Sequence, residues 1–353
     1  MDGSPIRQKT YAVNRDLQPI QTDCVEVSIY GALTNLDCSN NQLTDLNVSN
    51  SVVITTLNCS NNQLNALDVS NNVSLRTLSC NNNQLTALDV SNNAEIINLN
   101  CNNNQLDALD IRKNVALKTL DCSNNQLAAF DVSNNAEIIN LNCSNNQLAA
   151  LDVSNNVAII TLDCHNNQLT ALDVSNNVVI TTLDCSNNQL AALDVSNNVE
   201  IIKLYCHSNQ LTVLDVSNNV SLTILYCSSN QLAALDVSNS VALKTLNCST
   251  NQLTTLDVSK NVELKTFNCS INKLETLDVS KNAAIMYFDF SRNTTITTLS
   301  VASSYGDASI STALATLITD ATSTTGTLNI YGGDNTTVHT AATTKGWTVN
   351  TNL

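Results

Sequence analysis

The feature of this sequence that most constrains its fold is a cysteine that recurs every 21 residues without an insertion. Each of these cysteines is followed three residues later by an asparagine, as in the stretch LDCSNNQLAALDVSNNVEIIK at residues 183–203. Strict self-similarity at this period predicts a solenoid whose coils pack on one another, rather than the several globular domains that 353 residues would otherwise suggest. The twelve cysteines of the series are Cys38, Cys59, Cys80, Cys101, Cys122, Cys143, Cys164, Cys185, Cys206, Cys227, Cys248 and Cys269.

The first half of each copy has the pattern of a short strand. One copy places Ile54, Leu57, Cys59, Asn62 and Leu64 at the positions of a leucine-rich repeat, with cysteine where that pattern has its third leucine. Leu57 and Cys59 alternate with polar residues, which predicts a strand whose apolar side chains point inward. Stacked copies of this strand would form a parallel β ladder.

The second half of the same copy, residues 64–70, alternates again, so we expect it to be extended as well. Every glycine and proline lies outside residues 32–305, so Asn71 and Asn72 must supply the turn into the next coil. Asparagine is suited to this role because it tolerates left-handed backbone and bonds to its own main chain. We expect Val73 to enter the core after the turn, which gives about seven inward apolar residues per coil.

This arrangement of columns resembles the cysteine-bearing 21-residue leucine-rich repeats of bacterial surface proteins of the internalin J kind. The resemblance covers about residues 32–300 and depends on the motif LDCSNNQL-x-x-LDVSNN-x-x-L. It implies a leucine-rich-repeat solenoid with buried cysteine and asparagine ladders. It also implies a ligand-binding or adhesive surface, and no catalytic residues.

The cysteine slot requires a small, readily buried apolar side chain, and a free thiol meets that requirement. Neighbouring Cβ atoms on a parallel ladder lie about 4.8 Å apart, further than the ~3.5–4.5 Å that a disulfide prefers. One cysteine per coil also lacks the C-x-x-C clustering of a zinc site. We therefore predict free, buried thiols, with metal binding or redox use as the alternative.

The asparagine that follows each cysteine is predicted to be structural. A buried amide at a bend can satisfy backbone groups of its own loop and of the neighbouring coil, each of which would cost about 1–3 kcal/mol if left unpaired. The column consists of Asn41, Asn62, Asn83, Asn104, Asn125, Asn146, Asn167, Asn188, Asn209, Asn230, Asn251 and Asn272.

Eleven aspartates form another column in the second half of the copies. Each precedes V-S-x-N or a close variant, so we expect its carboxylate to accept hydrogen bonds from its own turn. The alternative is that stacked carboxylates hold Ca²⁺, which prefers several oxygen ligands. The column consists of Asp68, Asp89, Asp110, Asp131, Asp152, Asp173, Asp194, Asp215, Asp236, Asp257 and Asp278.

The ends of the chain depart from the repeat. Residues 1–31 are predicted to form an arm and a cap, in which residues 24–29, including the out-of-register Cys24, make a strand that covers the first coil. Residues 301–353 are predicted to form an α/β cap, with helices at 309–321 and 336–344 and strands at 326–331 and 347–349. This last segment loosely resembles terminal modules that close leucine-rich-repeat arrays in bacterial and bacteriophage structural proteins.

Charge and composition exclude several classes of function. The formal net charge of −15 argues against nucleic acid or an anionic membrane as a partner. There is no run of about 18 apolar residues that could span a bilayer, and the first residues contain no apolar segment typical of a signal peptide. With only His165, His207 and His339 and no glycine-rich phosphate loop, the chain lacks the groups for nucleophilic or acid–base catalysis, so we expect neither an enzyme nor a cofactor.

Two adjacent coils break the polar pattern of the outward strand positions. They carry Lys203, Tyr205 and His207 in one coil and Ile224 and Tyr226 in the next, where most other coils have Thr, Asn, Asp or Ser. Aromatic side chains beside polar donors suit contacts with proteins or glycans, so these five residues are the candidate ligand site. The alternatives are neutral drift, or a cross-strand tyrosine pair that only stabilises the ladder.

Three phenylalanines, Phe130, Phe267 and Phe288, replace inward leucines and are predicted to belong to the core. The sequence therefore favours a non-enzymatic recognition or adhesion module that presents a polar β face to a protein or glycan on the exterior of a cell or virion. The main alternative is a structural virion appendage, such as a phage fibre or capsid decoration, that docks into an assembly through residues 1–30. An array that binds ice is a further alternative, which the aspartate column and the mixed Thr/Asn face argue against.

Overall fold

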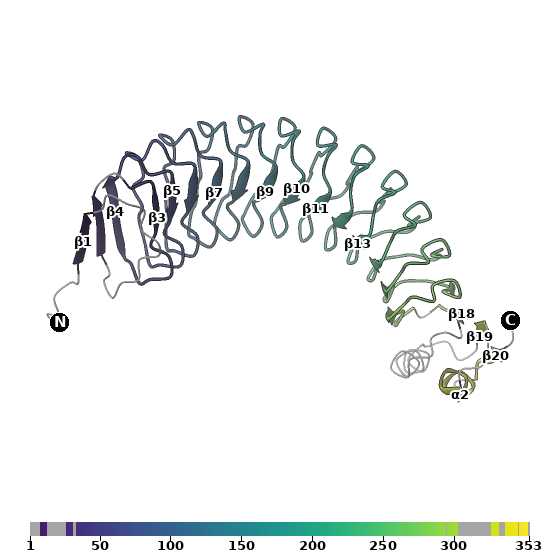
Figure 1. Cartoon of the computed structure of the whole chain (residues 1–353). Helices are drawn as coiled ribbons and strands as arrows, with labels where there is room; N and C mark the ends of the chain where they lie inside the picture. Colours follow the sequence, from purple (N-terminus) through teal and green to yellow (C-terminus); the bar gives the residue numbers. More distant parts are fainter. Residues whose placement is uncertain are drawn as a thin grey trace. The chain divides into compact units, whose positions relative to one another are not determined.

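A computed structural model describes residues 8–12, 26–30, 33–293, 295–302, 326–331, 336–344 and 346–351. The chain divides into two compact units, Met1–Asn177 and Val178–Leu353, and leucine-rich-repeat coils make up most of each unit (Figure 1). The predicted solenoid is confirmed. In both units each coil contributes one short strand to a parallel ladder, and the rest of the coil returns through two corners.

The ladder of the first unit consists of strands of three residues that pair in register at the interval of one coil. Leu36 pairs with Leu57 and Leu57 with Leu78, so each central leucine lies directly above the next. These leucines are buried, whereas the residues on either side point outward. The strands are β3 (Asn35–Asp37), β5 (Thr56–Asn58), β6 (Thr77–Ser79), β7 (Asn98–Asn100), β8 (Thr119–Asp121), β9 (Asn140–Asn142) and β10 (Thr161–Asp163).

The ladder of the second unit follows the same rule. Leu204 pairs with Leu225, and Phe267 with Phe288, again parallel and in register. The strands are β11 (Thr182–Asp184), β12 (Lys203–Tyr205), β13 (Ile224–Tyr226), β14 (Thr245–Asn247), β15 (Thr266–Asn268) and β17 (Tyr287–Asp289).

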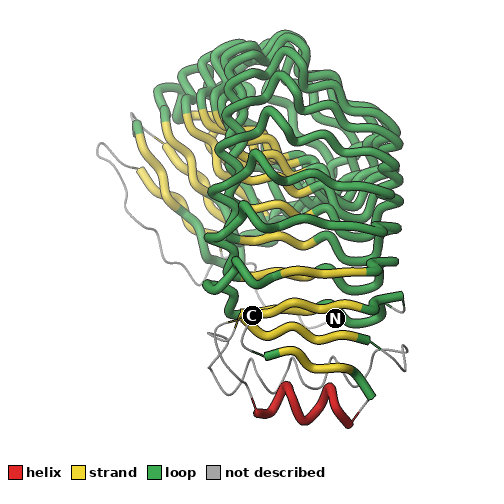
Figure 2. The backbone as a smooth tube through the Cα atoms, turned by 90° about the vertical axis from the view of Figure 1, so that its right-hand side faces the viewer, coloured by secondary structure: helices red, strands yellow, loops and turns green. Residues whose placement is uncertain are grey.

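The second half of most coils is extended but is not a strand. Figure 2 shows the short strands along one side of the coils and irregular backbone along the rest. Among the described coils that have no strand in this half, backbone bonds between neighbouring coils are sparse there; one joins the Gln63 N–H to the Leu43 carbonyl at 2.8 Å, where the second half begins. Among the described coils, strands occur in this half only near the ends, as β4 (Asp45–Asn50) and β16 (Thr276–Asp278).

Two corners connect the halves of each coil. We call residues 60–63 and their equivalents the first corner, and residues 70–73 and their equivalents the second corner. The prediction that Val73 enters the core is wrong, because its side chain is 54% exposed. The buried position at the second corner belongs instead to Asn72, which is fully buried. Most coils therefore bury six apolar side chains and two amides, as Ile54, Leu57, Cys59, Leu64, Leu67, Val69, Asn62 and Asn72 do in one coil.

The prediction of free, buried thiols is confirmed for the twelve cysteines of the ladder. Burial raises the pKa of Cys80, Cys143 and Cys227 to about 12, because a thiolate would lose its hydration inside the coil. The thiols therefore stay protonated at neutral pH and act as packing groups. Cys24 lies outside the described residues.

The predicted role of the first asparagine column is confirmed. The Asn62 amide nitrogen donates to the Cys59 carbonyl of its own coil and to the Cys38 carbonyl of the preceding coil, both at 3.0 Å. Its amide oxygen accepts the backbone N–H of Leu43 at 3.0 Å. One side chain thus joins two coils at the first corner.

At the amino-terminal end, β2 (Glu26–Tyr30) pairs in parallel with β4 and buries Val27 and Ile29. It overlaps the strand predicted at 24–29, whose first two residues lie outside the described residues. A further strand, β1 (Gln8–Ala12), pairs with β2.

At the carboxyl-terminal end, β18 (Thr298–Ala302), β19 (Thr327–Tyr331) and β20 (Thr348–Asn350) extend the sheet that starts with β16. The predicted helix at 336–344 is α2 (Thr336–Thr344), whereas the helix predicted at 309–321 lies outside the described residues. No helix in the described part of the chain is long and apolar enough to cross a membrane.

Candidate functional site

The aspartate column serves the second corner. Each of the eleven carboxylates accepts the backbone N–H of the residue two positions later, for example Ser70 to Asp68 Oδ1 at 2.9 Å and Ser133 to Asp131 Oδ1 at 2.9 Å. The hydroxyl and then the backbone N–H of Ser133 lower the pKa of Asp131, because both bonds favour the ionised carboxyl. The predicted turn role is therefore confirmed.

A similar turn lies on the outward face of the strands, just before the first corner. In many coils the strand ends with Asp or Asn, whose side chain accepts both the N–H and the hydroxyl of the serine two positions later. Ser186 bonds to Asp184 Oδ1 at 3.0 and 2.6 Å, and Ser249 bonds to Asn247 Oδ1 at 3.1 and 2.8 Å. This side-chain turn fixes the chain as it leaves the ladder.

The predicted tyrosine pair is brought together by this ladder. Tyr205 ends β12 and Tyr226 ends β13, and the two residues are register partners. Their rings stack with centroids 5.4 Å apart and an interplanar angle of 24°. Both side chains are half-buried, which leaves part of each phenol on the outward face. Partial burial, together with Tyr226 and Asp184, raises the pKa of Tyr205, so the phenol is protonated at neutral pH.

The tyrosines occupy the position that holds the turn acceptor elsewhere. A phenol cannot replace the Asp184 or Asn247 side chain as a close acceptor for the residue two positions later. In the described part of the chain, no side-chain acceptor is recorded for the Ser228 N–H or hydroxyl. The stack itself contributes only about 0.5–1.5 kcal/mol beyond area burial. Ladder stability is therefore a weak reason for placing tyrosine here.

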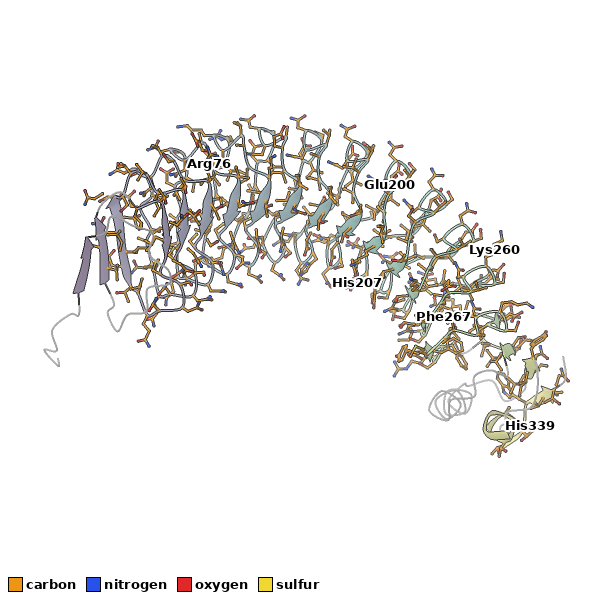
Figure 3. All side chains as sticks on the ribbon, viewed as in Figure 1. Arg76, Glu200, His207, Lys260, Phe267 and His339 are labelled. Atoms are coloured by element: carbon orange, nitrogen blue, oxygen red, sulfur yellow. The ribbon has the colours of Figure 1, made fainter. Side chains whose placement is uncertain are left out.

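The other predicted site residues surround this pair. His207 lies with its ring centroid 6.3 Å from that of Tyr226, tilted by 59°. Lys203 is exposed and pairs in register with Ile224, which is partly exposed. Figure 3 shows His207 on one side of the coils of the second unit and Glu200 on the opposite side. All five predicted residues thus share one outward face of two neighbouring coils.

His165 belongs to the first unit, and two of its contacts are with residues of that unit. Its Nδ1 lies 2.6 Å from Asp163 Oδ1, and its Nε2 lies 3.2 Å from the amide nitrogen of Asn145. These contacts show the arrangement that a histidine adopts when the strand ends with a carboxylate instead of a tyrosine.

Two of the three phenylalanines are core residues as predicted. Phe267 is fully buried and stacks on Phe288 with centroids 5.4 Å apart. The prediction for Phe130 is wrong, because its ring is partly exposed and lines hollows on the second-half face. The leucines at equivalent positions, such as Leu109 and Leu151, are 6–7% exposed. That position lies at the edge of the core, so a larger ring protrudes from it.

Comparison with known proteins places the fold among leucine-rich-repeat structures. No family model and no curated protein matches the chain. The functional domain of InlJ from Listeria monocytogenes, which includes a cysteine ladder, matches with a TM-score of 0.69 at 37% identity, over 70% of this chain and 56% of that chain. This chain therefore spans little more than half the length of the InlJ structure.

Two further structures share the fold at lower identity. The internalin InlF from Listeria monocytogenes matches with a TM-score of 0.67 at 20% identity, over 76% of this chain and 80% of that one. The plant peptide hormone receptor RGFR1, solved in complex with RGF2, matches with a TM-score of 0.61 at 17% identity, over 94% of this chain and 60% of that one. The predicted resemblance to internalins with a cysteine ladder is confirmed at the level of the fold.

Proposed function

We propose that this chain is a non-enzymatic recognition module that binds a protein or glycan partner through the strand face around β12 and β13. The site consists of Lys203, Tyr205, His207, Ile224 and Tyr226. A leucine-rich-repeat domain with a cysteine ladder, as in InlJ, supports a binding or adhesive role. The location we propose is the exterior of a cell or virion.

The observation that carries this proposal is the stacked tyrosine pair on a mostly polar face. Tyr226 stands where Asp184 and Asn247 serve as turn acceptors in nearby coils, so among the described residues the serine at this turn, Ser228, lacks the side-chain acceptor that Ser186 and Ser249 have. Large aromatic side chains with few rotatable bonds dominate binding energy at interfaces. A partner that covers the phenols, Lys203 and Ile224 would gain both apolar contact and polar bonds.

The test uses the labelled full chain as a probe of a glycan array and of an array of displayed extracellular proteins. The variant carries Tyr205→Asn and Tyr226→Asn, the residue found at this position as Asn58 and Asn247. It should fold normally, because an asparagine there can accept the backbone N–H of the residue two positions later, as Asn58 accepts that of Ser60 and Asn247 that of Ser249. We expect binding to the partners of the native chain to weaken by about 2 kcal/mol or more, the usual size of a hot-spot effect.

Tyr287→Thr is the matched control. Tyr287 is 54% exposed on the outward side of β17, and Thr266 occupies the equivalent position in the preceding coil. Loss of binding in the double variant with retention in Tyr287→Thr would support the site. A folded double variant that binds every partner as the native chain does would refute it and favour a structural appendage that docks through residues 1–30.

A further inference from the structure

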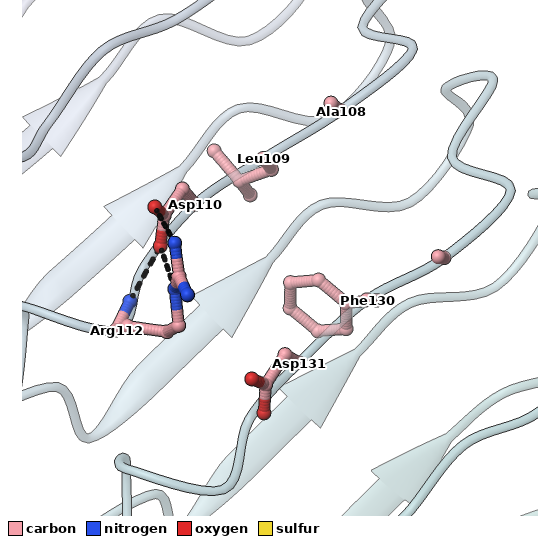
Figure 4. Close-up of a pocket in the computed structure, with 7 residues that line it drawn as sticks. Ala108, Leu109, Asp110, Arg112, Phe130 and Asp131 are labelled. Atoms are coloured by element: carbon pink, nitrogen blue, oxygen red, sulfur yellow. Dashed lines mark hydrogen bonds and ion pairs between the residues drawn. The ribbon is translucent and has the colours of Figure 1, made fainter.

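A second apolar surface lies on the opposite side of the coils, in the first unit. Phe130 stands in the column that holds Leu109 and Leu151, but its ring is only partly buried. Figure 4 shows the ring in the place that Leu109 has in the preceding coil, with Asp131 beside it and the Asp110–Arg112 pair on the adjoining coil. The exposed ring is therefore a local feature of one coil.

Two hollows flank this ring. One, of about 340 Å³, lies toward Asp110 and Arg112, and the other, of about 440 Å³, lies toward Asp152. They share Ala129, Phe130 and Asp131, and we call them together the Phe130 trough. The trough is open because alanines line it where longer side chains would fill it; they are Ala108, Ala128, Ala129, Ala149 and Ala150.

The charges around the trough are unequal on its two sides. Arg112 binds Asp110 through two side-chain bonds, Nε to Oδ1 at 3.0 Å and a terminal nitrogen to Oδ2 at 2.7 Å, so this wall is neutral as a pair. Asp131 and Asp152 are exposed, and each accepts a hydrogen bond from the serine of its own turn, Ser133 or Ser154. Arg112 also attracts Asp131 electrostatically, but the guanidinium hydrogen bonds of Arg112 go to Asp110. The pKa of each is lowered by the hydroxyl and then the backbone N–H of that serine, so both are ionised at neutral pH.

We propose that the Phe130 trough binds a segment of a partner protein in which an aromatic or aliphatic side chain is flanked by lysine or arginine. The apolar side chain would pack on the Phe130 ring between the alanines. Both the partner side chain and the ring would then lose contact with water, which favours binding. The basic side chains would pair with Asp131 and Asp152. Charge complementarity favours this occupant over an acidic or neutral segment, since the whole chain carries a formal charge of −15.

The experiment measures fluorescence anisotropy of a labelled Gly-Lys-Phe-Lys-Gly peptide titrated with the full chain. We expect saturable binding that weakens as salt increases, because the ion pairs are exposed. The matched peptide Gly-Glu-Phe-Glu-Gly lacks the basic side chains, and Gly-Lys-Ala-Lys-Gly lacks the aromatic ring. Each should bind at least about tenfold more weakly, which corresponds to about 1.4 kcal/mol of binding free energy. No saturable binding, or equal binding of the acidic peptide, would overturn the proposal.

Protein variants assign the binding to the trough. Phe130→Leu restores the side chain of the neighbouring coils and should raise the Kd about tenfold, as should Asp131→Asn combined with Asp152→Asn. Phe267→Leu, at a fully buried phenylalanine, and Asp194→Asn, beside the ordinary Leu193, are controls that should leave the Kd unchanged. Peptide binding that persists in Phe130→Leu would place the site elsewhere and refute the proposal. The tyrosine double variant should bind the peptide normally, so this test can fail independently of the proposed function.

Discussion

Both corners of a typical coil bury an asparagine that bonds to backbone groups, but the two asparagines use their amide groups differently. At the first corner, Asn125 uses both ends of its amide: the nitrogen donates to the carbonyls of Cys101 and Cys122, and the oxygen accepts the N–H of Leu106 at 3.0 Å. At the second corner, the nitrogen of Asn135 donates to the carbonyls of Ile111 and Asn114. The buried oxygen of Asn135 has no partner among the described residues.

The residue types found at the two corner positions differ accordingly. The first-corner position is asparagine in every coil from Asn41 to Asn272, and Asn293 continues the column. The second-corner position is serine in two coils, at Ser51 and Ser240. The first-corner amide donates through its nitrogen and accepts through its oxygen, and a serine hydroxyl is too short to replace both sets of bonds. The second-corner amide only donates, so a hydroxyl can replace it, as when Ser240 bonds to the Asn219 carbonyl at 3.4 Å.

The corners also differ in backbone conformation. Every first corner contains a residue with positive φ, between 51° and 57°, and no described second corner contains one. Asparagine occupies this position in the earlier coils, but the later coils place Ser208, Ser229, Thr250, Ile271 and Arg292 there. Left-handed backbone is most costly for β-branched residues, so the first corner is least favourable in the coils of Thr250 and Ile271.

The largest difference in the free energy of unfolding is expected when asparagine is replaced by serine at each of the two corners. Asn125→Ser should destabilise the protein by about 4 kcal/mol. The shorter hydroxyl would leave a buried N–H and several carbonyls without hydrogen-bond partners, at a cost of roughly 1–3 kcal/mol each. Asn135→Ser should cost about 1 kcal/mol, since it loses donor bonds but removes an unpaired buried oxygen. Urea unfolding followed by circular dichroism measures both. Equal losses would show that the amide oxygen of the first corner contributes nothing.

Much of this organisation follows from the sequence, and the exceptions have physical reasons. The 21-residue period predicts the ladder, the buried thiols and the first asparagine column, because each position can be assigned to a face by alternation. The turn at the second asparagine column was predicted but its burial was not, because hydrophobic patterning assigns a buried position to Val73 before it assigns one to Asn72. The regularity of the second asparagine was the available signal.

The candidate sites divide in the same way. Register alone places Tyr205 against Tyr226, so the stack could be predicted from the repeat length. Phe130 was assigned to the core because its column is apolar. The column lies at the edge of the core because alanines neighbour it and because this half of the coil has no regular strand. The apolar–polar alternation of the sequence indicates neither feature.

A smaller effect is expected from relieving strain at a first corner. Ile271 has a φ of 53° and is 40% exposed, so its side chain gains little from burial there. Ile271→Asn should stabilise the protein by about 1 kcal/mol, the cost of left-handed backbone for a residue other than glycine or asparagine. Asn124→Ile, with a φ of 53° at the same position of an earlier coil, should cost a similar amount. Thermal unfolding of both variants tests this, and a destabilised Ile271→Asn would contradict the strain argument.

The smallest effect on stability should come from acid, which protonates the turn carboxylates of the second corner. The pKa values of Asp68, Asp131 and Asp152 are lowered by serine hydroxyl and backbone N–H bonds, whereas the first-corner amides do not titrate. A carboxyl whose pKa is lower in the folded chain contributes stability that is complete above its ordinary value near 3.8 and is lost as the pH falls through its folded value. The Tm should therefore fall between pH 5 and pH 2, about the range in which these groups protonate.

The triple variant Asp68→Asn, Asp131→Asn and Asp152→Asn separates this contribution from the general effect of charge. Asn47 shows that an amide can keep the turn, since its oxygen accepts the Ser49 N–H at 3.0 Å. The variant should form the same turns without a titrating group, so its Tm should fall less than that of the native chain over the same pH range. All other carboxyls are common to both proteins, and relief of repulsion along the aspartate column would act in the opposite direction. Parallel Tm curves for the two proteins would mean that the serine bonds hold the carboxylate and the carboxylic acid equally well, and the second corner would then be as insensitive to pH as the first.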